Sequence, residues 1–158
     1  MSVYLDIETD RRGRIAVSGF YARGTGLVQL IGRDVTAAGL LRSLPRHRLL
    51  FTFNGHSFDL PLIKKQLGLD LRLRYTTVDL RHSCARAGWR GGQKLIERHL
   101  GIDRKLPGLD GRDAVRLWSS FSDGGDASAL ESLLVYNRED VMNMVRIRAA
   151  LRREGVLR

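Results

Sequence analysis

The sequence predicts an α/β fold with a central mixed five-stranded sheet flanked by helices. Three apolar segments joined by short glycine-containing turns open the chain, and helix-like and strand-like patterns alternate after them. The chain has 158 residues and no internal repeat. We therefore expect one domain over residues 1–158.

The first three strands are expected at 2–8, 14–22 and 27–31. The turn from Asp10 to Gly13 and the sequence Gly24-Thr25-Gly26 separate them. Links this short are typical of hairpins, so these strands should form an antiparallel meander.

Alternating helices and strands are expected in the rest of the chain. Asp34 is the expected N-cap of a helix that runs to Ser43, and Ser128-x-x-Glu131 resembles a capping box at the start of the last helix. The other elements expected are strands at 49–53 and 71–79 and helices at 58–66, 91–100 and 111–120. In the last helix the apolar residues recur at helical spacing: Leu130, Leu133, Leu134, Val141, Met144 and Val145.

The charge of the chain favours a polyanionic partner. Lysine and arginine total 27 against 17 acidic residues, which gives a formal charge of +10. Nucleic acid is the commonest such partner. Because arginine greatly outnumbers lysine, genome base composition is the alternative explanation.

The N-terminus and the cysteine content favour a cytoplasmic protein with no membrane partner. Acidic residues stand where a signal peptide would be basic, and no apolar run reaches membrane-spanning length. The single cysteine, Cys84, excludes an intrachain disulfide.

Asp6 and Glu8 form the first candidate site. They are two residues apart in an apolar strand, so their side chains point to the same face. Paired carboxylates repel each other unless a cation lies between them, and hard cations prefer oxygen ligands. The pair therefore predicts a Mg²⁺ or Mn²⁺ site if further carboxylates join it.

A second candidate, Asp59, follows the apolar strand at 49–53 in the segment Asn54-Gly55-His56-Ser57-Phe58-Asp59. A loop after a buried strand is where α/β folds build sites. Alternatively, Asp59 is only an acid favoured by a helix N-terminus. His56 is expected to be incidental, with a role as ligand or base as the alternative. Asp79 is expected to cap the following helix, with a role in the site as the alternative.

A third candidate lies in the last helix. Tyr136 and Asp140 are four residues apart and share a face beside the apolar stripe. The alternative is an ion pair between Asp140 and an arginine, with Tyr136 as ordinary core. Glu139 points to a different face and should be solvated.

These segments, taken in order, resemble the DEDD 3′–5′ exonucleases of the ribonuclease H-like superfamily. The first motif matches Asp6-Ile7-Glu8 and the second matches Asn54 to Asp59. The third, Tyr136-x-x-x-Asp140, is similar to that of the tyrosine subgroup. The chain is more similar still to the YprB-like domains, although many of those have histidine where this chain has Tyr136.

The resemblance implies a ribonuclease H-like fold and a nuclease that uses two Mg²⁺ or Mn²⁺ ions. Asp6 would bridge both ions, Glu8 and Asp140 would complete the shell of the ion that carries the attacking water, and Asp59 would serve the second. Tyr136 would orient the water. The enzyme would release nucleoside 5′-monophosphates from the 3′ end of single-stranded DNA or RNA.

The resemblance also implies substrate contacts. Asn54, Phe58 and Thr9 would position the terminal nucleotide, although core packing is the alternative for Phe58. Arg138 would contact phosphate or lie on a solvated helix face, and Trp89 and Trp118 would stack on bases or pack in the core. A partner protein or a homodimer would supply substrate choice.

Two other functions share this fold. The first is a catalytically weak or inactive nucleic-acid-binding module. The second is an endonuclease or strand-transfer enzyme.

Overall fold

The computed structural model describes residues 2–46 and 48–157 and contains one mixed five-stranded sheet, in the order β3-β2-β1-β4-β5. The first three strands form the antiparallel meander, while β4 pairs in parallel with β1 and with β5. The predicted sheet and meander are confirmed. The strands are β1 (Ser2–Thr9), β2 (Ile15–Ala22), β3 (Gly26–Ile31), β4 (Leu49–Thr52) and β5 (Thr76–Asp79).

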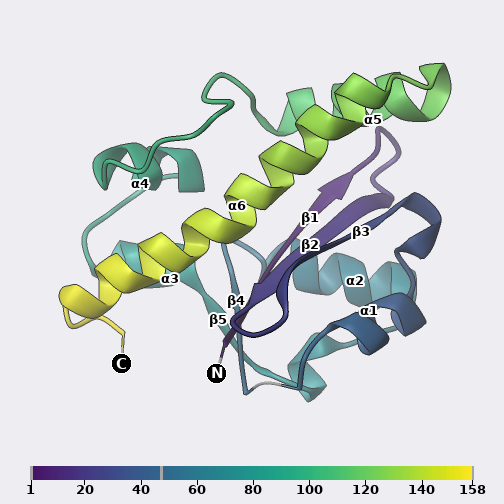
Figure 1. The fold of residues 1–158 in the computed structure, drawn as a ribbon. Helices are drawn as coiled ribbons and strands as arrows, with labels where there is room; N and C mark the ends of the chain where they lie inside the picture. The colour runs from purple at the N-terminus through teal and green to yellow at the C-terminus, as the bar shows by residue number, and fades with distance from the viewer. Residues whose placement is uncertain (1, 47, 158) are drawn as a thin grey trace.

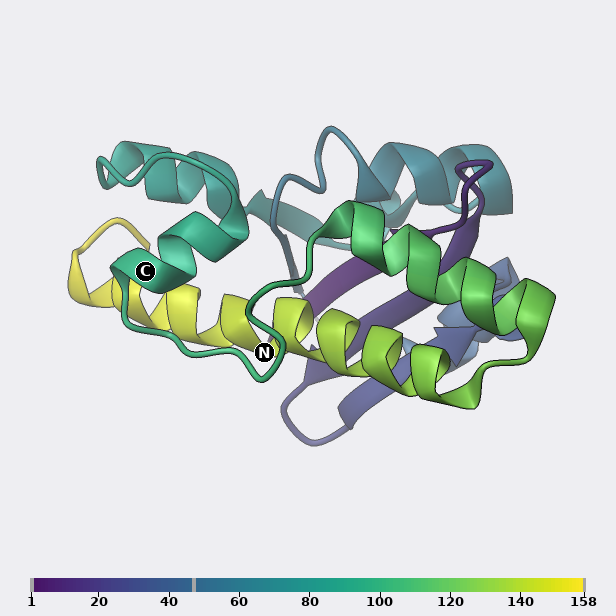
Figure 2. The same ribbon diagram turned by 90° about the horizontal axis from the view of Figure 1, so that it is seen from above.

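Helices cover both faces of the sheet (Figures 1 and 2). On one face lie α1 (Ala37–Ser43) and α2 (Asp59–Leu67). The long α6 (Ala127–Arg153) crosses the other face together with α5 (Gly111–Gly124). Two short helices, α3 (Leu80–Arg86) and α4 (Gln93–His99), pack beside α6. No helix within residues 2–46 and 48–157 has the length and apolarity that crossing a bilayer requires.

The alternation of side chains along β1 decides what each face of the sheet carries. Val3, Leu5 and Ile7 are buried in the core that includes residues of α1 and α2. Tyr4 faces the other way and packs in a second core with residues of α6. Asp6 and Glu8 have the parity of Tyr4, so both carboxylates lie beneath α6.

Two predicted helix starts are wrong by two residues. Asp34 ends a 3₁₀ turn, η1 (Gly32–Asp34), and Thr36 caps α1 instead, because its hydroxyl accepts a hydrogen bond from Gly39 N at 2.9 Å. Asp126 caps α6, accepting from the amides of Ser128 and Ala129, which places Ser128 inside the first turn.

A capping box does occur, but at the start of α5. The Asp110 side chain accepts from Asp113 N, and the Asp113 side chain accepts from Asp110 N. The strand predicted at 71–79 is also shorter than expected. Residues Leu71–Leu73 form a second 3₁₀ turn, η2, because the Asp70 side chain caps it through Arg72 N.

Candidate active site

Three predicted carboxylates converge beneath α6. Asp6 and Glu8 project from β1, and Asp140 projects from the middle of α6. One carboxylate oxygen from each lies within 4.8 Å of the others. Glu8 is 7% exposed, and its Oε1 is buried with no hydrogen-bond partner among the described residues. This donor set suits a hard divalent cation.

Asp59 lies beside this group at the start of α2. It is 4% exposed, and its Oδ1 accepts a hydrogen bond from Ile7 N at 3.1 Å. The parallel pairing of β4 with β1 ends at Tyr4, so Ile7 N lies beyond it and needs another acceptor. Asp59 therefore supports the strand between the two β1 carboxylates and leaves Oδ2 for other partners.

Burial raises the pKa values of all four carboxyl groups, and repulsion within the group adds to the shifts of Asp6, Glu8 and Asp59. Burial raises the pKa of Glu8 to about 8, with Asp140 adding to the shift. Burial likewise raises the pKa of Asp59 to about 7. The pKa of Asp6 is well above its usual value because of burial and then the Glu8 charge, and burial raises that of Asp140 although Arg104 opposes it. A divalent cation would remove this cost of ionisation.

Asn137 on α6 orients the Asp6 carboxylate. Its Nδ2 donates to Asp6 Oδ2 at 2.9 Å, and its Oδ1 accepts from Gln29 Nε2 at 2.9 Å. Gly19 lies opposite Asp6 on β2, and a Cβ atom at that position would come within 2.0 Å of Asn137 Oδ1. The absence of a side chain at Gly19 therefore makes room for the amide that fixes Asp6.

Lys94 on α4 holds the hydroxyl of Tyr136. Its Nζ donates to Tyr136 Oη at 2.7 Å and to Leu109 O at 2.5 Å. Burial, followed by the charges of Asp140, Glu8 and Asp6, raises the pKa of Tyr136 above its ordinary value. The phenol thus stays protonated, and because it accepts from Lys94, its own hydrogen is free to point elsewhere.

Arg104, in the connection between α4 and α5, forms ion pairs with the buried Glu97 and the partly buried Asp140. Its guanidinium donates to Asp140 and to both oxygens of Glu97. The side chains of Arg104 and Glu97 are 4% and 1% exposed. The structure therefore contains both the predicted alternative, an ion pair between Asp140 and an arginine, and the carboxylate group.

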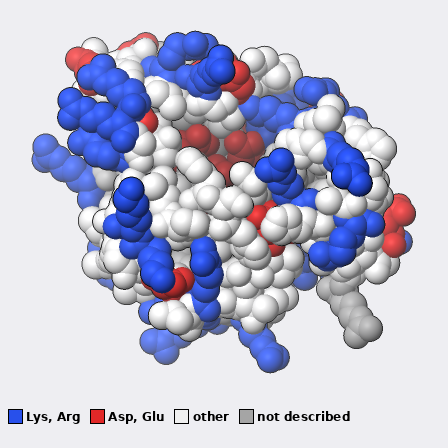
Figure 3. Space-filling view, turned by 180° about the vertical axis from the view of Figure 1, so that it is seen from behind, with Lys and Arg blue, Asp and Glu red and all other residues white. Residues whose placement is uncertain are grey.

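A cavity of about 280 Å³ opens beside these residues, with Asp6, Lys94, Tyr136 and Asp140 in its wall. Figure 3 shows acidic atoms on the floor of a hollow whose rim carries lysine and arginine side chains. A basic rim around an acidic floor would attract a polyanion and leave the floor for cations.

The residues predicted to contact substrate differ in their surroundings. Phe58 is 48% exposed, which rules out core packing. Thr9 is half-buried at an irregularity of the β1–β2 pairing. Asn54 has a left-handed backbone (φ 64°), and its Oδ1 accepts from Arg81 Nη1 at 2.8 Å, so its side chain has a structural partner.

The structure confirms some of the remaining predictions about single residues and contradicts one. Asp79 caps α3 through Arg81 N, as predicted. Glu139 is not solvated, because it is half-buried and accepts from Lys105 N. Trp89 packs against the second core. Arg138 is exposed and lines a separate cavity together with Lys105 and Asn143.

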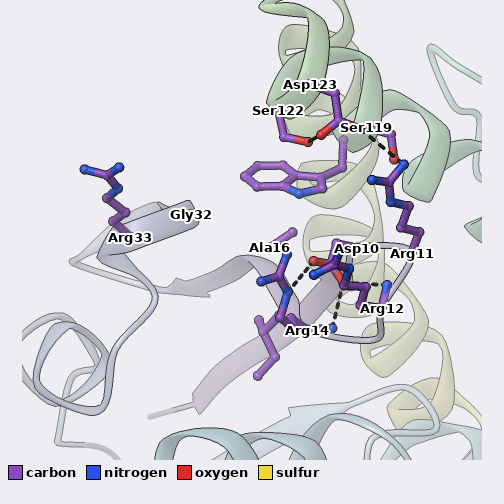
Figure 4. Close-up of a pocket in the computed structure, with 12 residues that line it drawn as sticks. Asp10, Arg11, Arg12, Arg14, Ala16, Gly32, Arg33, Ser119, Ser122 and Asp123 are labelled. Carbon is purple, nitrogen blue, oxygen red and sulfur yellow. Dashed lines mark hydrogen bonds and ion pairs between the residues drawn. The ribbon is translucent and has the colours of Figure 1, made fainter.

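A second hollow, of about 490 Å³, lies past the C-terminal end of β1. Figure 4 shows Arg33 on one side of it and Arg11, Arg12 and Arg14 on the other. Arg11 pairs with Asp123 and Arg14 with Asp10. Arg12 and Arg33 have no acidic partner among the described residues, and Trp118 forms part of the wall.

Sequence reasoning missed most of the residues that support the site. Asn137, three positions before Asp140, had a signal, because i and i+3 residues share a helix face. Gly19, Lys94 and Arg104 had none, since their roles depend on which segments the fold brings together.

A family model described as the RNase H superfamily matches residues 3–152. The chain therefore belongs to the RNase H superfamily. No curated protein matches it.

Solved structures show the same RNase H-like fold at low sequence identity. NrnC from Brucella melitensis has a TM-score of 0.65 and 18% identity, with 98% of this chain and 76% of that chain covered. It has also been solved with bound Mg²⁺ and bound to pGG. The family B DNA polymerase from the hyperthermophilic archaeon Pyrobaculum calidifontis has a TM-score of 0.66 and 16% identity. That match covers 89% of this chain but only 23% of the polymerase.

Proposed function

We propose that residues 1–158 form a metal-dependent 3′–5′ exonuclease of the tyrosine DEDD subgroup. It would hydrolyse phosphodiester bonds of single-stranded DNA or RNA and release nucleoside 5′-monophosphates. The observation that carries the proposal is the group of Asp6, Glu8 and Asp140, whose oxygens lie within 4.8 Å, with buried Asp59 beside them. The NrnC structures with Mg²⁺ and with pGG support the choice of cofactor and substrate.

The four carboxylates fit two Mg²⁺ or Mn²⁺ ions. The unpartnered Glu8 Oε1 and the raised pKa values of Glu8 and Asp59 are typical of a site short of positive charge. Asp6, Glu8, Asp59 and Asp140 would hold the ions. When bound, the ions would acidify a water molecule and stabilise the leaving oxygen of the phosphodiester.

The neighbouring side chains set the geometry of these ligands. Asn137 fixes one oxygen of Asp6, and the Ile7 amide fixes one oxygen of Asp59. Arg104 restrains Asp140. Such hydrogen bonds hold ligands in place before the ions arrive, which lowers the cost of binding.

Tyr136 would act as a hydrogen-bond donor to the attacking water rather than as a base. Its raised pKa excludes deprotonation near neutral pH. Lys94 Nζ occupies a lone pair of the Tyr136 oxygen, so the hydroxyl hydrogen is the group left to face the cavity.

Exposed aromatic and basic side chains would hold the strand. Phe58, which is 48% exposed, and Thr9 would position the terminal nucleotide. Further along the strand, phosphates would contact Arg12 and Arg33 and a base would stack on Trp118. Basic side chains bind the backbone and aromatic side chains stack on bases without reading sequence.

The test is release of mononucleotides from a 5′-labelled single strand with Mg²⁺ or Mn²⁺. We expect successive shortening from the 3′ end, loss of activity in Asp6→Asn, and full activity in the exposed control Glu154→Gln. A strand whose 3′ end is blocked should not be shortened. Absence of metal-dependent activity, equal activity in Asp6→Asn, or cleavage of a circular strand would contradict the proposal.

One observation favours a catalytically weak or inactive binding module instead. Arg104 already donates to Asp140, so a cation occupies part of the carboxylate group. This alternative predicts salt-dependent binding of single strands without turnover at any metal concentration. Turnover that rises with Mg²⁺ and saturates would exclude it.

A further inference from the structure

A second cluster of metal-ligating side chains lies outside the carboxylate group. His56 belongs to the loop after β4, Asp79 ends β5, and His82 lies in the first turn of α3. One ligand atom from each lies within 4.8 Å of the other two. The two imidazole rings meet edge to face, with centroids 5.9 Å apart.

Three backbone amides fix the Asp79 carboxylate in this cluster. Its Oδ1 accepts from Asn54 N at 2.8 Å and from Arg81 N at 3.0 Å, and its Oδ2 accepts from His56 N at 3.1 Å. Asp79 is 3% exposed. Oδ2 therefore has a lone pair available, in a carboxylate whose orientation is already set.

His56 Nε2 is buried without a hydrogen-bond partner among the described residues. A buried polar nitrogen without a partner is costly, and a metal ion would satisfy it. The guanidinium of nearby Arg81 does not act as the counter-ion of this cluster, because its Nη1 donates to Asn54 Oδ1 instead.

We propose that His56, Asp79 and His82 bind one divalent transition-metal ion of the Zn²⁺ class. Two imidazoles and one carboxylate suit Zn²⁺, whereas Mg²⁺ prefers oxygen ligands and water. Three protein ligands leave a fourth position for water. The ion would tie the loop that leads to Asp59 to the start of α3, and it would be distinct from the ions proposed for Asp6 and Glu8.

The test uses an untagged chain with Asp6→Asn and Glu8→Gln, so that the carboxylate group no longer competes for metal. Zn²⁺ is measured by equilibrium dialysis, and Co²⁺ by its visible absorption, which reports a low-coordinate site with nitrogen ligands. We expect one Zn²⁺ per chain, a Co²⁺ band that Zn²⁺ abolishes, and a higher melting temperature with Zn²⁺.

His82→Ala and His56→Ala, each added to this background, should raise the Zn²⁺ dissociation constant at least about tenfold and remove the Co²⁺ band. The matched control is His99→Ala, an exposed histidine that packs against Trp89. Absence of a Co²⁺ band in the parent, or equal losses in His99→Ala and His82→Ala, would overturn the site. Because nuclease activity is not measured, the result stands apart from the proposed function.

Discussion

Replacing Glu8 by glutamine should stabilise the metal-free protein at neutral pH. Burial raises the pKa of Glu8 from 4.5 to about 8, so the folded state binds a proton that the unfolded chain releases. Stability therefore falls as the pH rises from 4.5 to about 8. At pH 7 the solution lies about 2.5 pH units above the unfolded pKa of Glu8, and at roughly 1.4 kcal/mol per unit the loss of stability is about 3 to 4 kcal/mol. A neutral glutamine side chain at this position would not incur this cost.

Urea unfolding in EDTA at pH 4 and pH 7 measures the effect. We expect the free energy of unfolding of Glu8→Gln to exceed that of the wild type by about 3 to 4 kcal/mol at pH 7 and to equal it at pH 4. The control Glu154→Gln, at the exposed end of α6, should have the same free energy of unfolding as the wild type at both pH values. Saturating Mg²⁺ should stabilise the wild type and not Glu8→Gln. Equal stability of the two at pH 7, or a gain that persists at pH 4, would refute the electrostatic reasoning.

Three further variants test the site and the second hollow. Tyr136→Phe should lower kcat about a hundredfold and leave the Mg²⁺ concentration dependence unchanged, because in the proposed mechanism the hydroxyl accepts from Lys94, would donate to the attacking water and would not bind metal. Gly19→Ala should lower the free energy of unfolding by about 2 kcal/mol, since its Cβ would lie 2.0 Å from Asn137 Oδ1. The double variant Arg12→Ala/Arg33→Ala should reduce the salt dependence of single-strand binding by about 1.4 in log–log slope.

Each of these has a matched control. Tyr21→Phe removes a hydroxyl outside the site and should keep its activity. Gly124→Ala adds a methyl group where nothing lies within 4 Å and should not destabilise. Arg152→Ala/Arg153→Ala removes the same charge from the far end of α6 and should keep the salt slope. A control that changes as much as its partner would contradict the assigned role.

The sequence predicted the sheet and the candidate carboxylates because both leave local signals. Alternating apolar residues place Asp6 and Glu8 on one face, and helical spacing places Tyr136 beside Asp140. Helix starts leave weaker signals, because Thr36 and Asp126 compete as caps with the nearby Asp34 and Ser128.

The supporting residues could not be found from local patterns. Lys94 and Arg104 lie on segments with no periodic signal that would place them against α6, and their partners are 42 and 36 residues away. Gly19 is informative only when the register of β1 and β2 is known, since only then does it lie beneath Asn137. Long-range pairing of this kind is a property of the tertiary fold.

The Arg104 ion pair would make metal binding at the proposed site an exchange rather than a simple addition. A guanidinium held by Asp140 and Glu97 already neutralises part of the acidic group, so an arriving ion has to share or displace it. Glu97 is 1% exposed and would keep Arg104 in place after the exchange. If the proposed metal site is correct, its affinity for the ion would be set partly by the connection between α4 and α5, and substitutions in residues 100–110 would change that affinity without altering the carboxylates.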